Sequence, residues 1–401
     1  LYNLNNNGHL KRSLGLNKKS EKIDKSRFHF ISEVALNHLR HSNNFYITIY
    51  SELENEIDKH DILKLYDECL RYNIPRNKII IFSNNINPNK IITLFKNKFK
   101  IQNSKEFLFI NFNEQLLFKG DELLNDKLFN FFVKVDELNT KKKYRGLFLN
   151  KRLREHRLII LSLLANDNLI DNNLISFNMN YTNVDFFEEY ISKNHYIRVD
   201  EYSNKSTMLD TIFTNSDVNK ILNGFKLLKS INKKILDIDD ISEKENASFE
   251  VDDKSLYLDT YFSIVGETEF FDNWKDYTTE KVIKPIQQFH PFVIIGRPYV
   301  LKDLKSYGFK TFSDFWDESY DNIEDNQHRI LKVYELIRDL INKSDEEWEL
   351  LYKQIIPILI YNRDILKKYS GKYQRYLSEQ QLCKLISHET NKNYTRLLQK
   401  T

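Results

Sequence analysis

The chain has 401 residues, 41% of them hydrophobic, and it carries 60 basic and 57 acidic side chains, which gives a formal net charge of +3. At roughly 100–200 residues per domain this length predicts two domains, and the near balance of charge lacks the domain-wide basic excess of dedicated nucleic-acid-binding domains. Only two cysteines occur and no apolar run approaches the ~18 residues that span a bilayer, which argues against a disulfide framework and a membrane span.

The first third of the chain alternates strand and helix patterns. Short β-branched and aromatic runs predict strands at 45–50, 78–82 and 107–112, and helical spacing predicts helices at 28–39 and about 58–72. Strand–helix–strand repetition favours a parallel α/β sheet. Ligands of such sheets bind outside the carboxyl ends of the strands, so the residues that follow the first strand, Ser51 to Glu54, are expected to meet a substrate.

The pattern restarts after a basic run, Lys141–Arg145, which we interpret as a solvated linker between two domains. The restart predicts strands at 146–149, 174–177, 261–265 and 292–295, a turn and strand at 308–312, helices at 157–165 and over most of 205–235, and an exposed acidic loop at 237–254. From residue 323 onward the chain is expected to be helical, with segments near 324–342, 345–370 and 377–398.

A basic cluster joins a predicted strand to a predicted helix. It runs from Asn150 to Arg157 and includes Arg152 and His156. Helix N-termini bind anions through free N–H groups and the helix dipole, and positive side chains there oppose that dipole. A bound pyrophosphate explains them, since arginine offers a bidentate fork to phosphate. The alternative is an exposed basic turn.

Acidic side chains follow a later strand and open the next helix. Glu267 and Glu269 come directly after the strand at 261–265, and Glu280 and Lys281 lie at a predicted helix start. Carboxylates can hold the hydroxyls of a sugar or ribose, and Lys281 can neutralise a phosphate as a compact charge. The alternatives are a solvated loop and an ordinary first helical turn, in which glutamate is favoured.

The order of these residues resembles a known family. Tyr277-Thr278-Thr279-Glu280-Lys281, after a strand that ends in a glutamate, resembles the donor-binding motif of α-1,3-fucosyltransferases. The longer pattern, with Lys284-Pro285-Ile286, His290-Pro291-Phe292 and Gly308–Asp321, is similar to fucosyltransferase-like glycosyltransferases of phages, giant viruses and bacteria. The similarity covers about 145–330, includes Leu149–Arg157, and is reduced to the α/β rhythm in the N-terminal half.

The resemblance implies a fold and a reaction. The fold is α/β and GT-B-like, with two Rossmann-like domains facing a cleft and C-terminal helices; the domains would be 1–140 for the acceptor, 141–345 for the donor, and 346–401 as helices packing across both. The reaction moves a sugar from a nucleotide-diphosphate sugar to an acceptor hydroxyl, with inversion and without a metal. The resemblance implies that Glu280 contacts ribose or sugar hydroxyls and that Lys281 and Arg157 bind the diphosphate. Together with the clusters above, the predicted donor-binding residues are Asn150, Arg152, His156, Arg157, Glu267, Thr279, Glu280 and Lys281.

An inverting reaction needs one general base near the acceptor hydroxyl. Related enzymes place a carboxylate in the acceptor domain, and Glu52 or Glu54 is the candidate here. Asp237-Ile238-Asp239 mimics a metal-binding motif but lies in an acidic loop, so we expect no metal and no cofactor besides the nucleotide-sugar. The segments 284–286 and 308–321 depart from fucosyltransferases, so the sugar is not assigned as fucose.

The sequence also leaves two other functions open and predicts a cellular location. The acceptor is a glycan, a protein or DNA with a hydroxylated base, and the DNA reading would use the basic runs 141–145 and 151–157. A catalytically silent carbohydrate-binding or structural protein of the same fold is the second alternative. Leu1–Asn5 show no signal-peptide pattern, which with the scarcity of cysteine predicts a cytoplasmic location, in a bacterium or a virus-infected cell.

Overall fold

The computed structural model describes a set of ranges that contain most of the second half of the chain. They are 33–41, 47–50, 59–83, 107–111, 120–124, 130–138, 141–150, 153–179, 187–189, 191, 195–199, 206–210, 213–234, 253–268, 270 and 279–369. Two compact units divide the chain: one has residues 1–117, 274–277 and 371–401, and the other has 118–273 and 278–370. This division lies near residue 117 rather than 140, and it leaves residues 346–370 with the second unit.

The first unit contains a three-stranded parallel sheet, as the sequence predicts. Its elements are α2 (Glu33–His41), β1 (Ile47–Tyr50), α3 (Lys59–Arg71), the 3-10 turn η1 (Arg76–Lys78), β2 (Ile79–Ser83) and β3 (Leu108–Asn111). The strand order is β1-β2-β3, with both pairs parallel. Ile79, Ile80 and Ile81 of the central strand are fully buried, which is typical of a parallel strand covered on both faces.

The second unit contains a larger sheet of order β10-β9-β4-β5-β8, in which β8 alone is antiparallel to its neighbour. Its elements are η3 (Val135–Glu137), β4 (Tyr144–Leu149), α6 (Glu155–Asn166), β5 (Leu174–Asn178), β6 (His195–Val199), β7 (Ser206–Asp210), α8 (Asn215–Ile231), β8 (Lys233–Lys234), α10 (Lys254–Leu258), β9 (Thr260–Gly266), α11 (Glu280–Gln287), β10 (Phe292–Ile295), α12 (Val300–Ser306), η5 (Ser319–Asn322), α13 (Asn326–Ile341) and α14 (Asp345–Lys368).

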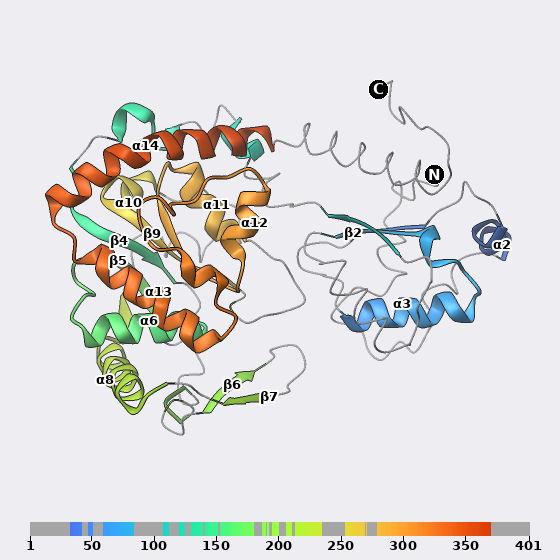
Figure 1. Ribbon diagram of the computed structural model, residues 1–401, viewed down its shortest axis with the longest axis horizontal. Helices are drawn as coiled ribbons and strands as arrows, with labels where there is room; N and C mark the ends of the chain where they lie inside the picture. The colour runs from blue at the N-terminus through green and yellow to red at the C-terminus, as the bar shows by residue number, and fades with distance from the viewer. Residues whose placement is uncertain are drawn as a thin grey trace. The chain divides into compact units, whose positions relative to one another are not determined.

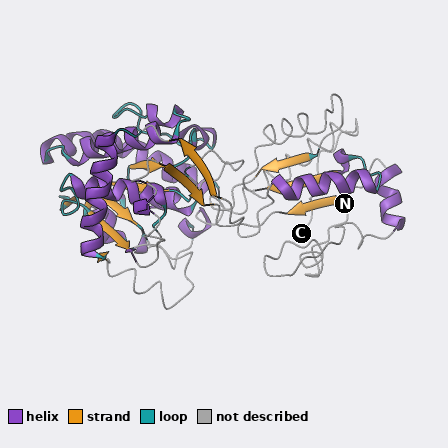
Figure 2. Ribbon diagram, turned by 90° about the horizontal axis from the view of Figure 1, so that it is seen from below, coloured by secondary structure: helices purple, strands orange, loops and turns teal. Residues whose placement is uncertain are grey.

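Helices cover this sheet on both faces. In Figure 1, α6 and α13 lie on one side of β4 and β9, and α11 and α14 lie on the other. Figure 2 shows the second unit from below, with helices surrounding most of its strands. Every residue of β9 is buried, as expected for a central strand of a covered parallel sheet. The prediction of an α/β fold with a parallel sheet is therefore confirmed.

The prediction that 205–235 is mostly helical is wrong at its start. Residues 206–210 form β7, which pairs antiparallel with β6. Helix α8 begins only at Asn215 because Thr214 caps it: the Thr214 hydroxyl accepts from the Asp217 N–H at 3.2 Å, and the Asp217 carboxylate accepts from the Thr214 N–H at 3.0 Å.

The prediction of a strand at 308–312 is also wrong, because these residues form no strand. The main chain of Lys310 bonds to a side chain instead of a neighbouring strand: its N–H donates to Asn362 Oδ1 and its carbonyl accepts from Asn362 Nδ2, both at 2.8 Å. The amide of α14 thus satisfies both backbone groups, so an extended partner is not needed.

The basic run 141–145 is not a solvated linker. It leads into β4, and Lys142 is 5% exposed with its Nζ 5.0 Å from the centre of the Tyr352 ring. Arg145 forms an ion pair with Asp345 at 2.5 Å. Lys143 is paired to Asp259, so two of the cations in the segment have acidic partners inside the second unit.

None of the helices in the described ranges is long and apolar enough to cross a membrane.

Candidate functional site

The order of strands in the larger sheet marks one edge as a place for a ligand. From β4 the chain passes to β5 on one side, and later it returns to β9 on the other side and continues to β10. The strand order reverses between β4 and β9, and ligands of open α/β sheets bind outside the carboxyl ends of the strands at such a switch point. Helix α6 follows β4 and helix α11 follows β9, so both helix N-termini lie at this edge.

Arg157 and His156 of α6 bond to the same atom at the end of β9. The Glu267 carbonyl accepts from Arg157 Nη2 at 3.0 Å and from His156 Nε2 at 2.8 Å. A carbonyl can only accept, so Nε2 of His156 carries the ring proton. Gly266 lets the Arg157 side chain cross the strand, because a Cβ there would lie 2.8 Å from Arg157 Cγ.

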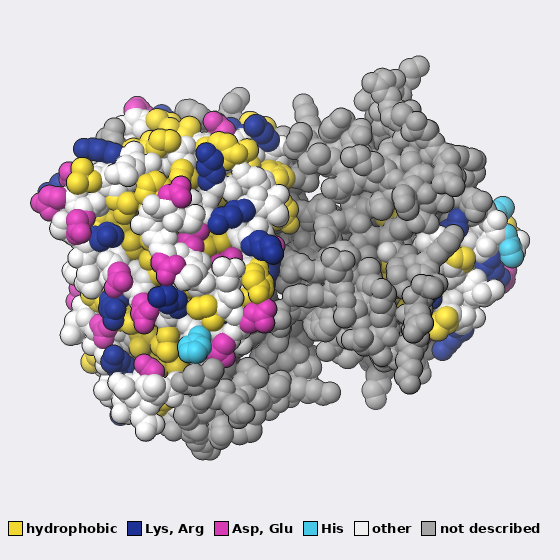
Figure 3. Space-filling model, in the orientation of Figure 1, with side chains coloured by type: hydrophobic (Ala, Val, Ile, Leu, Met, Phe, Trp, Pro, Cys, Tyr) yellow, Lys and Arg dark blue, Asp and Glu magenta, His cyan; other side chains and the backbone are white. Residues whose placement is uncertain are grey.

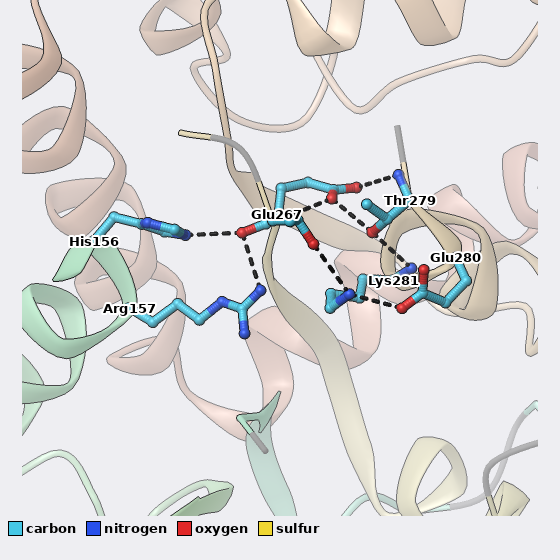
Figure 4. A network of polar contacts seen from close by, with 7 residues as sticks. His156, Arg157, Glu267, Thr279, Glu280 and Lys281 are labelled. Carbon is cyan, nitrogen blue, oxygen red and sulfur yellow. Dashed lines mark hydrogen bonds and ion pairs between the residues drawn. The ribbon is translucent and has the colours of Figure 1, made fainter. Parts of the chain in front are cut away.

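The Glu267 side chain joins the same strand end to α11. Its carboxylate accepts from the Thr279 N–H at 2.9 Å and from the Thr279 hydroxyl at 2.6 Å. It also accepts from the Thr268 N–H at 3.0 Å. Figure 4 shows His156 and Arg157 meeting the main chain of Glu267 on one side while its side chain reaches Thr279 on the other. One residue therefore connects the starts of two helices to one strand.

The first turn of α11 presents an acid and a base to solvent. Thr279 caps the helix through a 3.2 Å bond from the Lys281 N–H to its hydroxyl. The Lys281 ammonium lies 2.7 Å from Glu280 Oε1 and 3.4 Å from the Thr268 hydroxyl. The side chains of Lys281 and Glu280 are 33% and 25% exposed, so a ligand in solution can reach both.

Burial lowers the pKa values of His156 and Arg157, and the directions of these shifts give the charge of each side chain at pH 7. Burial and the charge of Arg157 hold the pKa of His156 well below its usual value, so its imidazole is neutral at pH 7. Burial, helped by the charge of Arg154, lowers the pKa of Arg157 to about 10, which leaves the guanidinium charged.

The two glutamates respond differently. Burial raises the pKa of Glu267 against the opposing charge of Lys281. For Glu280 burial acts in the same direction, but the charge and the hydrogen bond of Lys281 outweigh it and lower the pKa. Glu280 is therefore the more strongly ionised acid and the one exposed to solvent.

Phe270 and Arg329, which sequence patterns did not single out, pack beside His156 at this edge of the sheet. The Phe270 ring stacks on His156 at a centroid distance of 5.1 Å, and the Arg329 guanidinium lies 4.4 Å from the centre of the same ring. Arg329 Nη2 donates to the Phe270 carbonyl at 2.5 Å and its Nε donates to the Gly296 carbonyl at 3.0 Å. A signal was present, because Arg329 falls on the apolar face of α13 that carries Val333 at helical spacing.

The structure brings six of the predicted donor-binding residues into one bonded group: His156, Arg157, Glu267, Thr279, Glu280 and Lys281. Asn150 ends β4 at the same edge, where its N–H donates to the Ser176 hydroxyl at 3.2 Å. No hydrogen bond joins Asn150 to the group within the described ranges. Arg152, Glu269, and the predicted bases Glu52 and Glu54 lie outside the described residues.

Within the part of the chain that the structure describes, no group of three or more His, Cys, Asp or Glu side chains is arranged to hold a metal ion. The Asp237–Asp239 segment lies outside that part. Independence from metal stays a prediction.

Comparisons with protein-family models, with curated proteins and with solved structures found no match.

Proposed function

We propose that this protein is a glycosyltransferase that moves a sugar from a nucleotide-diphosphate sugar to an acceptor hydroxyl. The observation that carries the proposal is that Arg157 and Lys281 each lie in the first turn of a helix that begins at the switch-point edge between β4 and β9, and that Glu267 links the two turns. Helix N-termini and cationic side chains attract the same ligand, a phosphate or diphosphate. Glu280 adds an acceptor for hydroxyls beside it.

The ion pair of Glu280 and Lys281 suggests how the donor enters. A diphosphate oxygen takes the place of the carboxylate at Lys281 Nζ, and the freed Glu280 carboxylate accepts from ribose or sugar hydroxyls. As the bond from the anomeric carbon to the diphosphate breaks, negative charge gathers on the leaving group. Arg157 and Lys281 stabilise that charge electrostatically, and the neutral His156 holds the end of β9 in place.

The architecture proposed for this reaction is GT-B, with the acceptor on the first unit. The parallel sheet in each unit supports it. The proposed base is Glu52 or Glu54, which follow β1 in the chain. Exchange of each for Gln identifies the base as the residue whose loss stops sugar transfer while donor affinity is kept.

A thermal-shift panel tests the proposal and identifies the nucleotide. The panel contains UDP, GDP, ADP and CDP with their common sugar conjugates. At a ligand concentration 100 times the Kd, binding to the folded state adds about 2.7 kcal/mol of stability. We expect one nucleotide to raise the melting temperature. A protein whose melting temperature no nucleotide changes favours the silent carbohydrate-binding or structural alternative.

Lys281→Ala tests the assignment of the diphosphate site. Removal of one charged donor from the leaving group should lower the rate of donor turnover by about 10²-fold. The fold should stay intact, because the Lys281 ammonium is partly exposed and bonds only to neighbours in the described structure. Release of nucleoside diphosphate from the donor is the measurement. Lys226→Ala, an exposed lysine on α8, is the control and should keep wild-type turnover. Equal rates in both variants remove Lys281 from the site.

A further inference from the structure

Glu267 is a buried carboxylate whose oxygens both face protein donors. Its side chain is 1% exposed. Oε1 accepts from the Thr279 N–H, and Oε2 accepts from the Thr268 N–H and the Thr279 hydroxyl, at 2.6 to 3.0 Å. A group enclosed in this way does not reach a sugar hydroxyl. The direct donor contact expected of Glu267 from the sequence stays a prediction, and the contacts in this structure indicate a second role.

The atoms bonded to Glu267 belong to segments far apart in the chain. Thr279 is the cap residue of α11, while His156 and Arg157 belong to the first turn of α6. The carboxylate binds the cap and the carbonyl binds α6. Glu267 thus links the first turn of α11 to Arg157 through its own carboxylate and carbonyl (Figure 4).

We propose that Glu267 is a positioning residue: through Thr279 it fixes the first turn of α11, and so sets Glu280 and Lys281 at a defined place relative to Arg157. Its importance for donor binding rests on the function proposed above. Its effect on α11 does not, because the contacts exist without a ligand. The same carboxylate also accepts from the Thr268 N–H, next to the end of β9.

Glu267→Gln is a sharp probe because the two side chains have nearly the same shape. In one orientation of the amide, its NH₂ faces the Thr279 N–H. In the other orientation, its NH₂ faces the Thr268 N–H. Either way a donor opposes a donor, and one main-chain N–H loses its partner. The substitution therefore releases part of the connection without creating a cavity.

The chain provides a matched control in Glu318. This glutamate is also buried, accepts from the Thr311 hydroxyl at 2.5 Å and from the Phe312 N–H at 2.7 Å, and has a pKa raised by burial. Its hydrogen bonds in the described structure involve neither α6 nor α11. Glu318→Gln also replaces a buried carboxylate by an amide, but away from the site, so it measures what loss of a buried negative charge does to stability alone.

Two measurements on the full chain test the proposal, both made below the melting temperatures of all variants. The first is hydrogen exchange of peptides covering 279–287, which we expect to be at least tenfold faster at the start of α11 in Glu267→Gln and unchanged in Glu318→Gln. The second is the affinity for the nucleoside diphosphates UDP, GDP, ADP and CDP, which should fall at least tenfold only in Glu267→Gln.

Thr279 provides the second variant in case Glu267→Gln does not fold. Thr279→Val removes the hydroxyl that bonds to Glu267 and should reproduce both effects, whereas Thr279→Ser keeps the hydroxyl and should restore wild-type exchange and affinity.

The outcomes separate two kinds of failure. Unchanged exchange at α11 in Glu267→Gln overturns the positioning role. So does a loss of affinity that Glu318→Gln shares, because stability alone then explains it. If the wild-type protein binds none of the diphosphates, the proposed function fails, and the exchange result still decides whether Glu267 positions α11.

Discussion

Lys142 is a buried cation whose ammonium is poorly compensated. Its Nζ lies over the Tyr352 ring and has no hydrogen-bond partner within the described ranges. Burial lowers its pKa to about 8, although the charge of Asp259 opposes the shift. At pH 7 the amine is therefore largely charged in an environment that disfavours the charge.

Lys142→Met should raise the free energy of unfolding at pH 7 by about 1–3 kcal/mol, because it removes a desolvated charge and keeps the volume. The folded pKa of about 8 lies below the ordinary value of 10.5, so between these values the unfolded chain binds more protons. The free energy of unfolding of the wild type therefore rises with pH between pH 8 and pH 10.5 as Lys142 loses its proton. The difference in free energy of unfolding between Lys142→Met and the wild type is accordingly smaller at pH 10 than at pH 7.

Urea unfolding at pH 7 and pH 10 checks this expectation. Lys226→Met, at an exposed lysine of α8, should change little at either pH. A Lys142→Met variant that is less stable than wild type at pH 7, or whose advantage is the same at both values, contradicts the assignment of a buried charge.

Sequence patterns predicted which residues lie together at this edge of the sheet better than what each one contacts. Arg157, Glu280 and Lys281 stand out because charged groups follow predicted strands. The roles of Glu267 and Arg329 could not be predicted, because their partners lie on segments that only the folded sheet brings together. His156 looked like a phosphate ligand in sequence, whereas burial keeps its imidazole neutral.

At the level of elements, the packing of α8 on α6 depends on one glycine. A Cβ at Gly224 would lie 1.7 Å from the Ser162 carbonyl oxygen and 2.5 Å from its carbon. Backbone atoms cannot move aside as a flexible side chain does, so the two helices approach this closely only because residue 224 has no side chain.

Gly224→Ala should therefore destabilise the protein by about 3 kcal/mol or more, although alanine has the higher helix propensity. Chemical denaturation measures the loss. Asn223→Ala, at the exposed neighbouring position, is the control and should be neutral or slightly stabilising. Equal stability of the two variants would mean that α6 and α8 do not pack through Gly224.

The elements that sequence predicted well are those with strong local patterns. Local sequence alone predicts the strands β1, β2 and β10, which are β-branched runs. It also predicts the helices α13 and α14, which have apolar residues at helical spacing. The errors fall where a distant partner decides: β7 is a strand because β6 pairs with it, and residues 308–312 are not because Asn362 satisfies Lys310.

On the scale of the whole molecule, the described surface charges of both signs are mixed and do not form a single basic or acidic patch on the face drawn in Figure 3. On the face of the second unit drawn in Figure 3, basic and acidic side chains are interspersed. Lys142 is buried and Arg145 is ion-paired, whereas Lys141 and the paired Lys143 are exposed, so only part of the run 141–145 offers positive charge to a nucleic-acid backbone. The proposed donor site therefore rests on the bonded group around Glu267 and not on a basic surface.

The α/β class could be predicted from the rhythm of strands and helices, since hydrophobic periodicity reflects local geometry. The boundaries of the units could not, because residues 118–140 join the second unit through contacts such as the bond from the Val133 N–H to Gln288 Oε1 at 2.9 Å. The GT-B arrangement of the two units stays a prediction.

The most direct test of the donor site compares a nucleoside diphosphate with its parent nucleoside by titration calorimetry, for wild type, Lys281→Ala and Lys226→Ala. We predict that one of UDP, GDP, ADP or CDP binds wild type at least tenfold more tightly than its nucleoside. That ratio should collapse in Lys281→Ala and persist in Lys226→Ala. No diphosphate binding to wild type, or the same ratio in all three proteins, would contradict a diphosphate site at the start of α11.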